Sequence, residues 1–184
     1  ATQVANVPNS TEAHYAAGLF RADVPSGTSG DIVVGVDETM SQLGVIAWAV
    51  TGDHQIHDIE TDTSNSTSSV TLNGVPDGSV ILAGRASAVG QLHTWSSNVT
   101  ENIDQVVDGT VRHTGASSAK STGGDFTITC TPDASATDGR PRMFAIALSP
   151  SQGIGTNGFY LNYAASGSDL GDDASGNGND WANN

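Results

Sequence analysis

Alternation at a period of two marks the apolar stretches of this 184-residue chain and predicts β-strands. Residues 125–131 read DFTITCT, so Phe126, Ile128 and Cys130 share one face and three threonines share the other. Successive side chains of a strand point to opposite faces of a sheet. The stretch therefore has the pattern of a half-buried strand with its polar face in water.

Two further stretches alternate large apolar residues with alanine, namely residues 46–50 (IAWAV) and 144–148 (FAIAL). We expect the large residues to face the core and the alanines to lie on the outer face. Small outward residues suit the close approach of another chain or of a covering loop. Plain exposure of the alanines to solvent is the alternative.

The rest of the chain offers more short strands with turns between them. The further strand candidates are residues 14–20, 31–36, 55–60, 69–73, 79–86 and 104–113. Residues 99–107 fit either one or two helical turns or a strand. Turn-forming pairs such as Asn73-Gly74 and Asp108-Gly109 separate these stretches. Eight or nine short strands predict an all-β fold, an antiparallel β-sandwich or jelly roll.

A change in composition at Pro150 divides the chain into two predicted parts. Residues 1–150 are expected to form the β-sandwich domain. Residues 151–184 contain four Asp but no Lys, Arg or Glu, and are rich in Gly and Asn. We expect them to form an acidic Gly/Asn-rich tail or linker, since most of this segment lacks the apolar residues of a core.

The net charge is −14, from six Lys+Arg against twenty Asp+Glu. Nucleic-acid affinity depends on clustered cations that neutralise phosphates, and anionic lipids attract basic segments. The charge therefore argues against nucleic acid and against a membrane surface as partners. No stretch approaches the roughly 20 apolar residues that a membrane helix needs.

Catalytic motifs are sparse, and we expect the chain not to be an enzyme. Its one cysteine, Cys130, shares a face with Phe126 and Ile128, which favours a buried thiol over a nucleophile. No G-x-S-x-G motif occurs. His54 and His57 are three apart, which would put them on opposite faces of a strand rather than at a shared metal. A hydrolase with paired carboxylates stays as a third class of function.

Two weak candidate sites remain. Asp173, Ser175 and Asn177 place oxygen ligands at alternate positions, as in the first half of a calcium loop, but Asn184 stands where such loops carry a bidentate carboxylate. We expect the chain to need no cofactor, and calcium is the one candidate for a bound ion. Trp95 lies among polar residues, and a buried core position is favoured over the candidate role as an exposed platform for a sugar or a protein partner.

The tail carries the most specific motif of the chain. Residues 155–163 read GTNGFYLNY and residues 170–181 read LGDDASGNGNDW. This segment resembles marine tailed-phage fibre and appendage proteins, in which an NGFYLxF strand leads to DxSGNGNxW. Similar DxSGNGN openings start concanavalin A-like (laminin-G-type) jelly rolls, so these roughly 30 residues resemble the linker into such a domain. The resemblance implies a virion surface protein.

From these features we expect a structural component on the exterior of a tailed-phage particle, of the tail fibre or appendage type, with a role in assembly or host-surface attachment. Its partners would be other virion subunits, as a homo-oligomer with a trimer favoured, and a host-surface glycan is a further candidate. One alternative is a head decoration or cement protein of the same virion. Another is a carbohydrate-binding module of a secreted bacterial protein, which would need an exposed platform formed by Trp95 or by nearby tyrosines.

Overall fold

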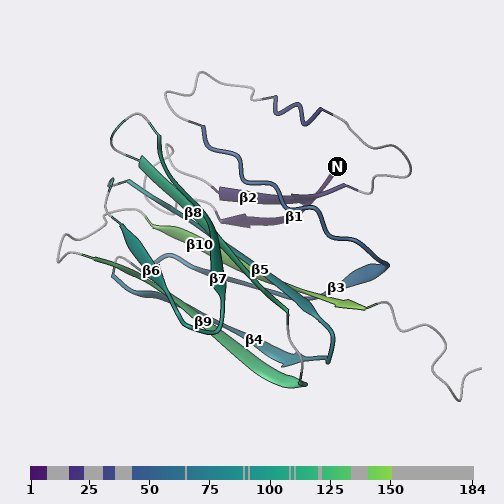
Figure 1. Ribbon diagram of the computed structural model, residues 1–184. Coiled ribbons are helices and arrows are strands. Elements are labelled where there is room, and N and C mark those ends of the chain that lie inside the picture. The colour runs from purple at the N-terminus through teal and green to yellow at the C-terminus, as the bar shows by residue number, and fades with distance from the viewer. Residues whose placement is uncertain are drawn as a thin grey trace, which may run out of the picture. The chain divides into compact units, whose positions relative to one another are not determined.

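The described chain is all-β, and its strands pair in antiparallel fashion, as the sequence predicts (Figure 1). The computed structural model describes residues 1–7, 17–22, 31–35, 43–64, 66–88, 90, 92–107, 109, 111–119, 122–133 and 141–150. The strands are β1 (Thr2–Val7), β2 (Ala17–Arg21), β3 (His54–Asp62), β4 (Ser68–Val75), β5 (Val80–Ser87), β6 (His93–Trp95), β7 (Thr100–Val107), β8 (Val111–Ala119), β9 (Gly124–Pro132) and β10 (Arg142–Pro150). None of these residues belongs to a helix that is long and apolar enough to cross a bilayer.

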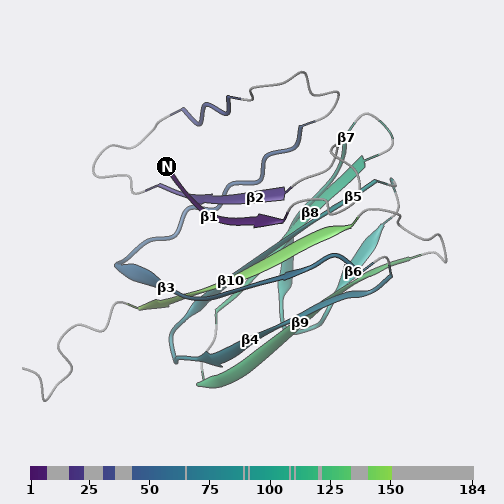
Figure 2. The same cartoon turned by 180° about the vertical axis from the view of Figure 1, so that it is seen from behind.

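Strands β3 to β10 form two facing sheets, seen from opposite sides in Figures 1 and 2. One sheet has the order β3-β10-β5-β8-β7 and the other has the order β4-β9-β6, while β1 and β2 pair separately. Apart from the β7–β8 hairpin, each step along the chain from β3 to β10 crosses from one sheet to the other. A jelly roll divides eight strands between two sheets. Here five of the eight strands belong to one sheet and three to the other, because β7 pairs with β8 in the larger sheet. The sandwich is confirmed, and the jelly-roll topology stays a prediction.

The main core lies between the two sheets. Its largest members on the three-stranded side are Leu72, Ile128 and Trp95, and those on the five-stranded side include Ile81 and Met143. The DFTITCT stretch forms most of β9 with the predicted faces, because Ile128 and Cys130 are fully buried while Thr127 and Thr131 are exposed. The threonine face is linked across strands, since the Thr71 and Thr127 hydroxyls lie 2.8 Å apart.

The alanines of β10 lie on the opposite side from the one expected. Ala145 and Ala147 are fully buried in the core between the sheets. Ile146 and Leu148 point to the other face of the five-stranded sheet and join Leu82 in a second apolar cluster. Large residues from the three-stranded sheet fill the space above the alanines, in the way that large and small side chains interdigitate in a packed core. Both faces of this sheet are therefore covered.

Several predicted boundaries change in the structure. Residues 99–107, left open between helix and strand, form β7, and residues 104–113 are two strands around a turn at Gly109 (φ 70°) rather than one. The described residues 31–35 and 43–50 pair with none of the three sheets, so the strands predicted at 31–36 and 46–50 are wrong there. Residues 14–16 and 151–184 lie outside the described residues. The predicted division at Pro150 stays a prediction.

Carboxylates of β3 bind the backbone edge of β4 and close one side of the sandwich. Asp62 accepts a hydrogen bond from the Ser69 amide at 2.6 Å, and Asp58 accepts one from the Asn73 amide at 2.8 Å. Burial alone would raise the pKa of Asp62, but hydrogen bonds from the Ser64 hydroxyl and from backbone amides outweigh it and lower the pKa. These contacts satisfy amides on an edge that would otherwise be open to another chain.

We expect Asp62→Asn to lower the free energy of unfolding by about 1 kcal/mol at neutral pH, because the side chain is partly exposed and a neutral amide accepts weaker hydrogen bonds. Since folding lowers the pKa of Asp62, its contribution is present at neutral pH and is lost as the pH falls through the folded-state value. Urea unfolding at neutral and acidic pH measures both effects. Asp77→Asn, at an exposed turn, is the matched control, and equal losses in the two variants would contradict the assignment.

Candidate interaction surface

Residues 43–50 lie over the outer face of the five-stranded sheet without pairing to it. The segment reads LGVIAWAV, an uninterrupted apolar run. Its side chains alternate along the whole length, with Ile46, Trp48 and Val50 half-buried. Trp48 and Val50 pack against the cluster formed by Leu82, Ile146 and Leu148. One side of the segment is thus bound to the sheet.

One of two facing glycines lets this segment come close. Gly84 of β5 and Gly115 of β8 are directly opposite each other in the sheet. A Cβ atom at Gly115 would lie 2.7 Å from the Trp48 ring, and one at Gly84 would lie 2.6 Å from the Phe144 ring. The two aromatic rings therefore occupy the space that side chains would fill, an arrangement known for glycines in sheets. The Trp48 indole also donates a hydrogen bond to the Asn102 Oδ1 of β7 at 3.3 Å.

We expect Gly115→Val to push the Trp48 ring off the sheet and to lower the free energy of unfolding by about 1–3 kcal/mol, the usual cost of overpacking. Backbone amides of residues 43–50 should then exchange faster with solvent deuterium. Gly35→Val is the control, because a Cβ atom there meets nothing within 4 Å. Unchanged exchange of residues 43–50 in Gly115→Val would contradict the docking of Trp48 on the glycine.

The other side of the segment is open and apolar. Leu43, Val45, Ala47 and Ala49 are exposed, Val45 at 55% of its surface. We call these four residues the outward face. Among the described residues, most of the large exposed apolar side chains lie in the first 50 positions of the sequence. Within those positions, the ones that do not belong to the outward face are Phe20, Ile32, Val33 and Val34. The four residues of the outward face share one side of one segment, and apolar side chains gathered in this way, unlike single scattered ones, mark interaction sites.

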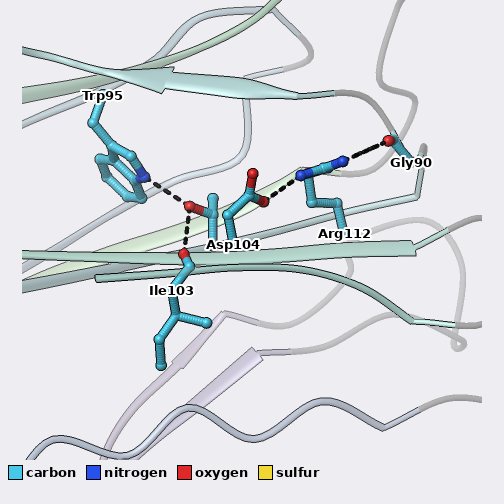
Figure 3. Close-up of polar contacts among 6 residues, drawn as sticks. Gly90, Trp95, Ile103, Asp104 and Arg112 are labelled. Atoms are coloured by element: carbon cyan, nitrogen blue, oxygen red, sulfur yellow. Dashed lines mark hydrogen bonds and ion pairs between the residues drawn. The ribbon is translucent and has the colours of Figure 1, made fainter. Parts of the chain in front are cut away.

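Polar groups buried between the sheets form a hydrogen-bonded set (Figure 3). The Trp95 indole donates to the Thr114 hydroxyl at 2.8 Å, and that hydroxyl donates to the Ile103 carbonyl at 3.0 Å. Arg112 forms an ion pair with Asp104 and donates to the Gly90 carbonyl at 3.1 Å. The Trp95–Thr114 hydrogen bond joins the two sheets, because β6 and β8 belong to different sheets, while the Arg112–Asp104 pair joins β7 and β8 within one sheet.

Trp95 occupies a core position. Only 8% of its surface is exposed, and its ring belongs to the cluster between the sheets. This burial contradicts the exposed-platform candidate and agrees with the buried core position that the sequence favoured. The signal for burial was the alternation His93-Thr94-Trp95, in which the first and third residues are buried and Thr94 is exposed.

His93 and Cys130 lie in the same buried region. Burial, followed by the positive charges of Arg85 and Arg112, lowers the pKa of His93 to about 4. Neither ring nitrogen of His93 has a hydrogen-bond partner among the described residues. Burial raises the pKa of the Cys130 thiol to about 12, although Arg85 acts in the opposite direction. A thiol with so high a pKa carries almost no thiolate at neutral pH and is a poor nucleophile.

The other predicted site residues take separate positions. His57 is exposed and its Nε2 lies 3.1 Å from the Asn73 carbonyl, while His54 is half-buried at the start of β3. Within the described ranges, no three His, Cys, Asp or Glu side chains gather as a metal site would require. The calcium candidates Asp173, Ser175 and Asn177 lie outside the described residues. That site stays a prediction.

No protein-family model and no curated protein matches this sequence. Among solved structures, the tripod (BppUct-A-L) from the baseplate of bacteriophage Tuc2009 is similar, with 15% sequence identity and a TM-score of 0.31. The similarity covers 70% of this chain and 84% of that chain.

Proposed function

We propose that this chain is a structural subunit on the exterior of a tailed-phage particle and that it works by binding other subunits. The observation that carries the proposal is the outward face of residues 43–50. Its four residues are apolar and exposed, while the opposite side of the same segment is bound to the sheet. A surface of this kind serves protein–protein contact rather than solvation.

The tail supports the phage part of the proposal. Residues 155–163 and 170–181 resemble a segment of marine tailed-phage fibre and appendage proteins, as described above. A fibre or appendage subunit is therefore favoured over a head decoration protein. The acidic charge of the chain suits a protein present in many copies, because like charges keep such a protein soluble.

The interior polar groups support an architectural role. The Arg112–Asp104 ion pair and the Trp95–Thr114 hydrogen bond connect strands and are directed into the core. For the carbohydrate-binding alternative, the burial of Trp95 removes one of the aromatic platforms that the hypothesis offered. No other described feature favours a sugar ligand.

Quantitative mass spectrometry of purified particles tests the proposal. Particles from the source phage are purified on a density gradient, and peptides from residues 1–150 are measured against a known virion subunit. We expect peptides of this chain to follow the particles in a fixed stoichiometry. Peptides that are abundant in the lysate of infected cells but absent from the particles would overturn the proposal.

A further inference from the structure

We infer that the outward face of residues 43–50 packs against the same face of a second copy of this chain, in antiparallel orientation about a two-fold axis. This contact names the partner of the surface described above and rests on the proposed assembly function.

The uninterrupted apolar sequence of residues 43–50 indicates that both sides of the segment are covered. Strands that are covered on both faces read as continuous apolar runs, whereas strands with one face in water alternate with polar residues. Residues 43–50 contain no polar side chain, although only one side meets the sheet. The apolar character of Leu43 and Val45 is therefore accounted for by a second layer above them.

The distribution of charge over the chain also favours a second copy as the partner. Two copies of a protein with a net charge of −14 repel each other through most of their surfaces. The stretch from residue 43 to residue 52 has no charged side chain, so two copies meet there without bringing carboxylates together. A basic partner would instead bind the acidic surfaces. A neutral apolar face suits a partner of the same charge, and a second copy is such a partner.

The sizes of the four side chains of the outward face favour an antiparallel contact between two copies. The outward face runs from large to small along the chain, in the order Leu43, Val45, Ala47, Ala49. In an antiparallel pair, Leu43 of each copy faces Ala49 of the other, and Val45 faces Ala47. Large residues then meet small ones along the whole contact, as close packing requires. A two-fold contact repeats each of these pairs, because the same patch is used by both copies.

Sedimentation velocity of the full chain at micromolar concentration tests the contact. We expect the wild type to have twice the 18.7 kDa mass of one chain, and Val45→Glu to have the mass of one chain with unchanged circular dichroism. Val106→Glu is the matched control, because Val106 is also exposed but lies on β7, and it should keep the dimer. A monomeric or trimeric wild type, or a dimeric Val45→Glu, would overturn the inference.

Cross-linking tests the orientation independently of stability. Two variants, Val45→Cys and Ala47→Cys, are mixed and oxidised, while the native Cys130 is buried and stays out of the reaction. We expect the mixed disulfide between position 45 of one copy and position 47 of the other to exceed either symmetric disulfide. Symmetric disulfides in excess would overturn the antiparallel contact. A dimer whose peptides are absent from purified particles would instead contradict the virion role and leave this contact standing.

Discussion

Acidification from pH 7 to pH 4 should cost the wild-type chain about 3 kcal/mol more of its unfolding free energy than it costs a His93→Leu variant. The pKa of His93 is lowered to about 4 in the folded protein from an ordinary value of 6.5. Well above pH 6.5 the imidazole is neutral in both states, so it contributes no pH dependence there. Between 6.5 and 4 the unfolded chain binds a proton that the folded chain rejects, and stability falls as the pH falls.

The physical cause is the position of His93 between the sheets. The side chain is buried, Arg85 and Arg112 oppose a further positive charge, and the carboxylates of Asp104 and Asp133 compensate only in part. His93→Leu removes the titrating group and also removes two ring nitrogens without hydrogen-bond partners. We therefore expect the variant to be at least as stable as the wild type at pH 7.

Urea unfolding at half-unit steps of pH measures the difference between the two proteins, so that the titration of the many carboxylates cancels. His57→Leu serves as the control for losing an imidazole, because His57 is exposed. Parallel stability curves for wild type and His93→Leu from pH 7 to pH 4 would contradict the burial of a neutral His93.

Asp104→Ala should lower the free energy of unfolding by about 3–5 kcal/mol, because it leaves the Arg112 charge buried without its partner. The two side chains are largely shielded, with 10% of Arg112 and 18% of Asp104 exposed. A second change, Arg112→Met, removes the stranded charge. We expect the double variant Asp104→Ala/Arg112→Met to recover at least half of the loss.

A double-mutant cycle from urea unfolding measures this coupling. Asp77→Ala is the control, since Asp77 is exposed at a turn and should change stability little. A loss below about 0.5 kcal/mol for Asp104→Ala, comparable with that of an exposed ion pair, would contradict a structural role for the pair.

The alternating patterns predicted much of the sandwich. The threonine-rich β9 follows from period-two alternation, and the central β5 and the edge strand β3 lie where residues 79–86 and 55–60 were predicted as strands between turns. The orientation of β10 did not follow, because a strand with both faces covered has no polar face to mark the outside. Its alanines and most of its large residues are buried, Phe144 being half-buried, and only the arrangement of layers decides which set faces which neighbour.

The buried polar set depends on strand register, which the sequence specifies only indirectly. Asp104 pairs with Thr114 and Val106 pairs with Arg112, so the ion pair joins diagonal neighbours on one face of the β7–β8 hairpin. The Asp108-Gly109 turn contained the signal for this register. The prediction of one strand over residues 104–113 did not take this turn into account. The proximity of Arg85 to His93 and Cys130 joins strands far apart in sequence and had no local signal.

The sequence of residues 43–50 also did not reveal which part of the chain the segment contacts. Its pattern predicted a strand, and the alternating burial is present, but no neighbouring strand pairs with it among the described residues. Gly115 explains its position, because the missing side chain leaves room for the Trp48 ring, while the facing Gly84 leaves room for Phe144 of β10. Those glycines belong to different strands, and their pairing becomes visible only in the sheet.

Cryo-electron microscopy of the particle tests the central claim most directly, because it shows both where the chain lies and what covers it. We predict copies of the β-sandwich on the particle exterior, with residues 43–50 buried at a contact between two copies. A chain found inside the particle, or found outside it with Leu43 and Val45 open to solvent, would contradict the account.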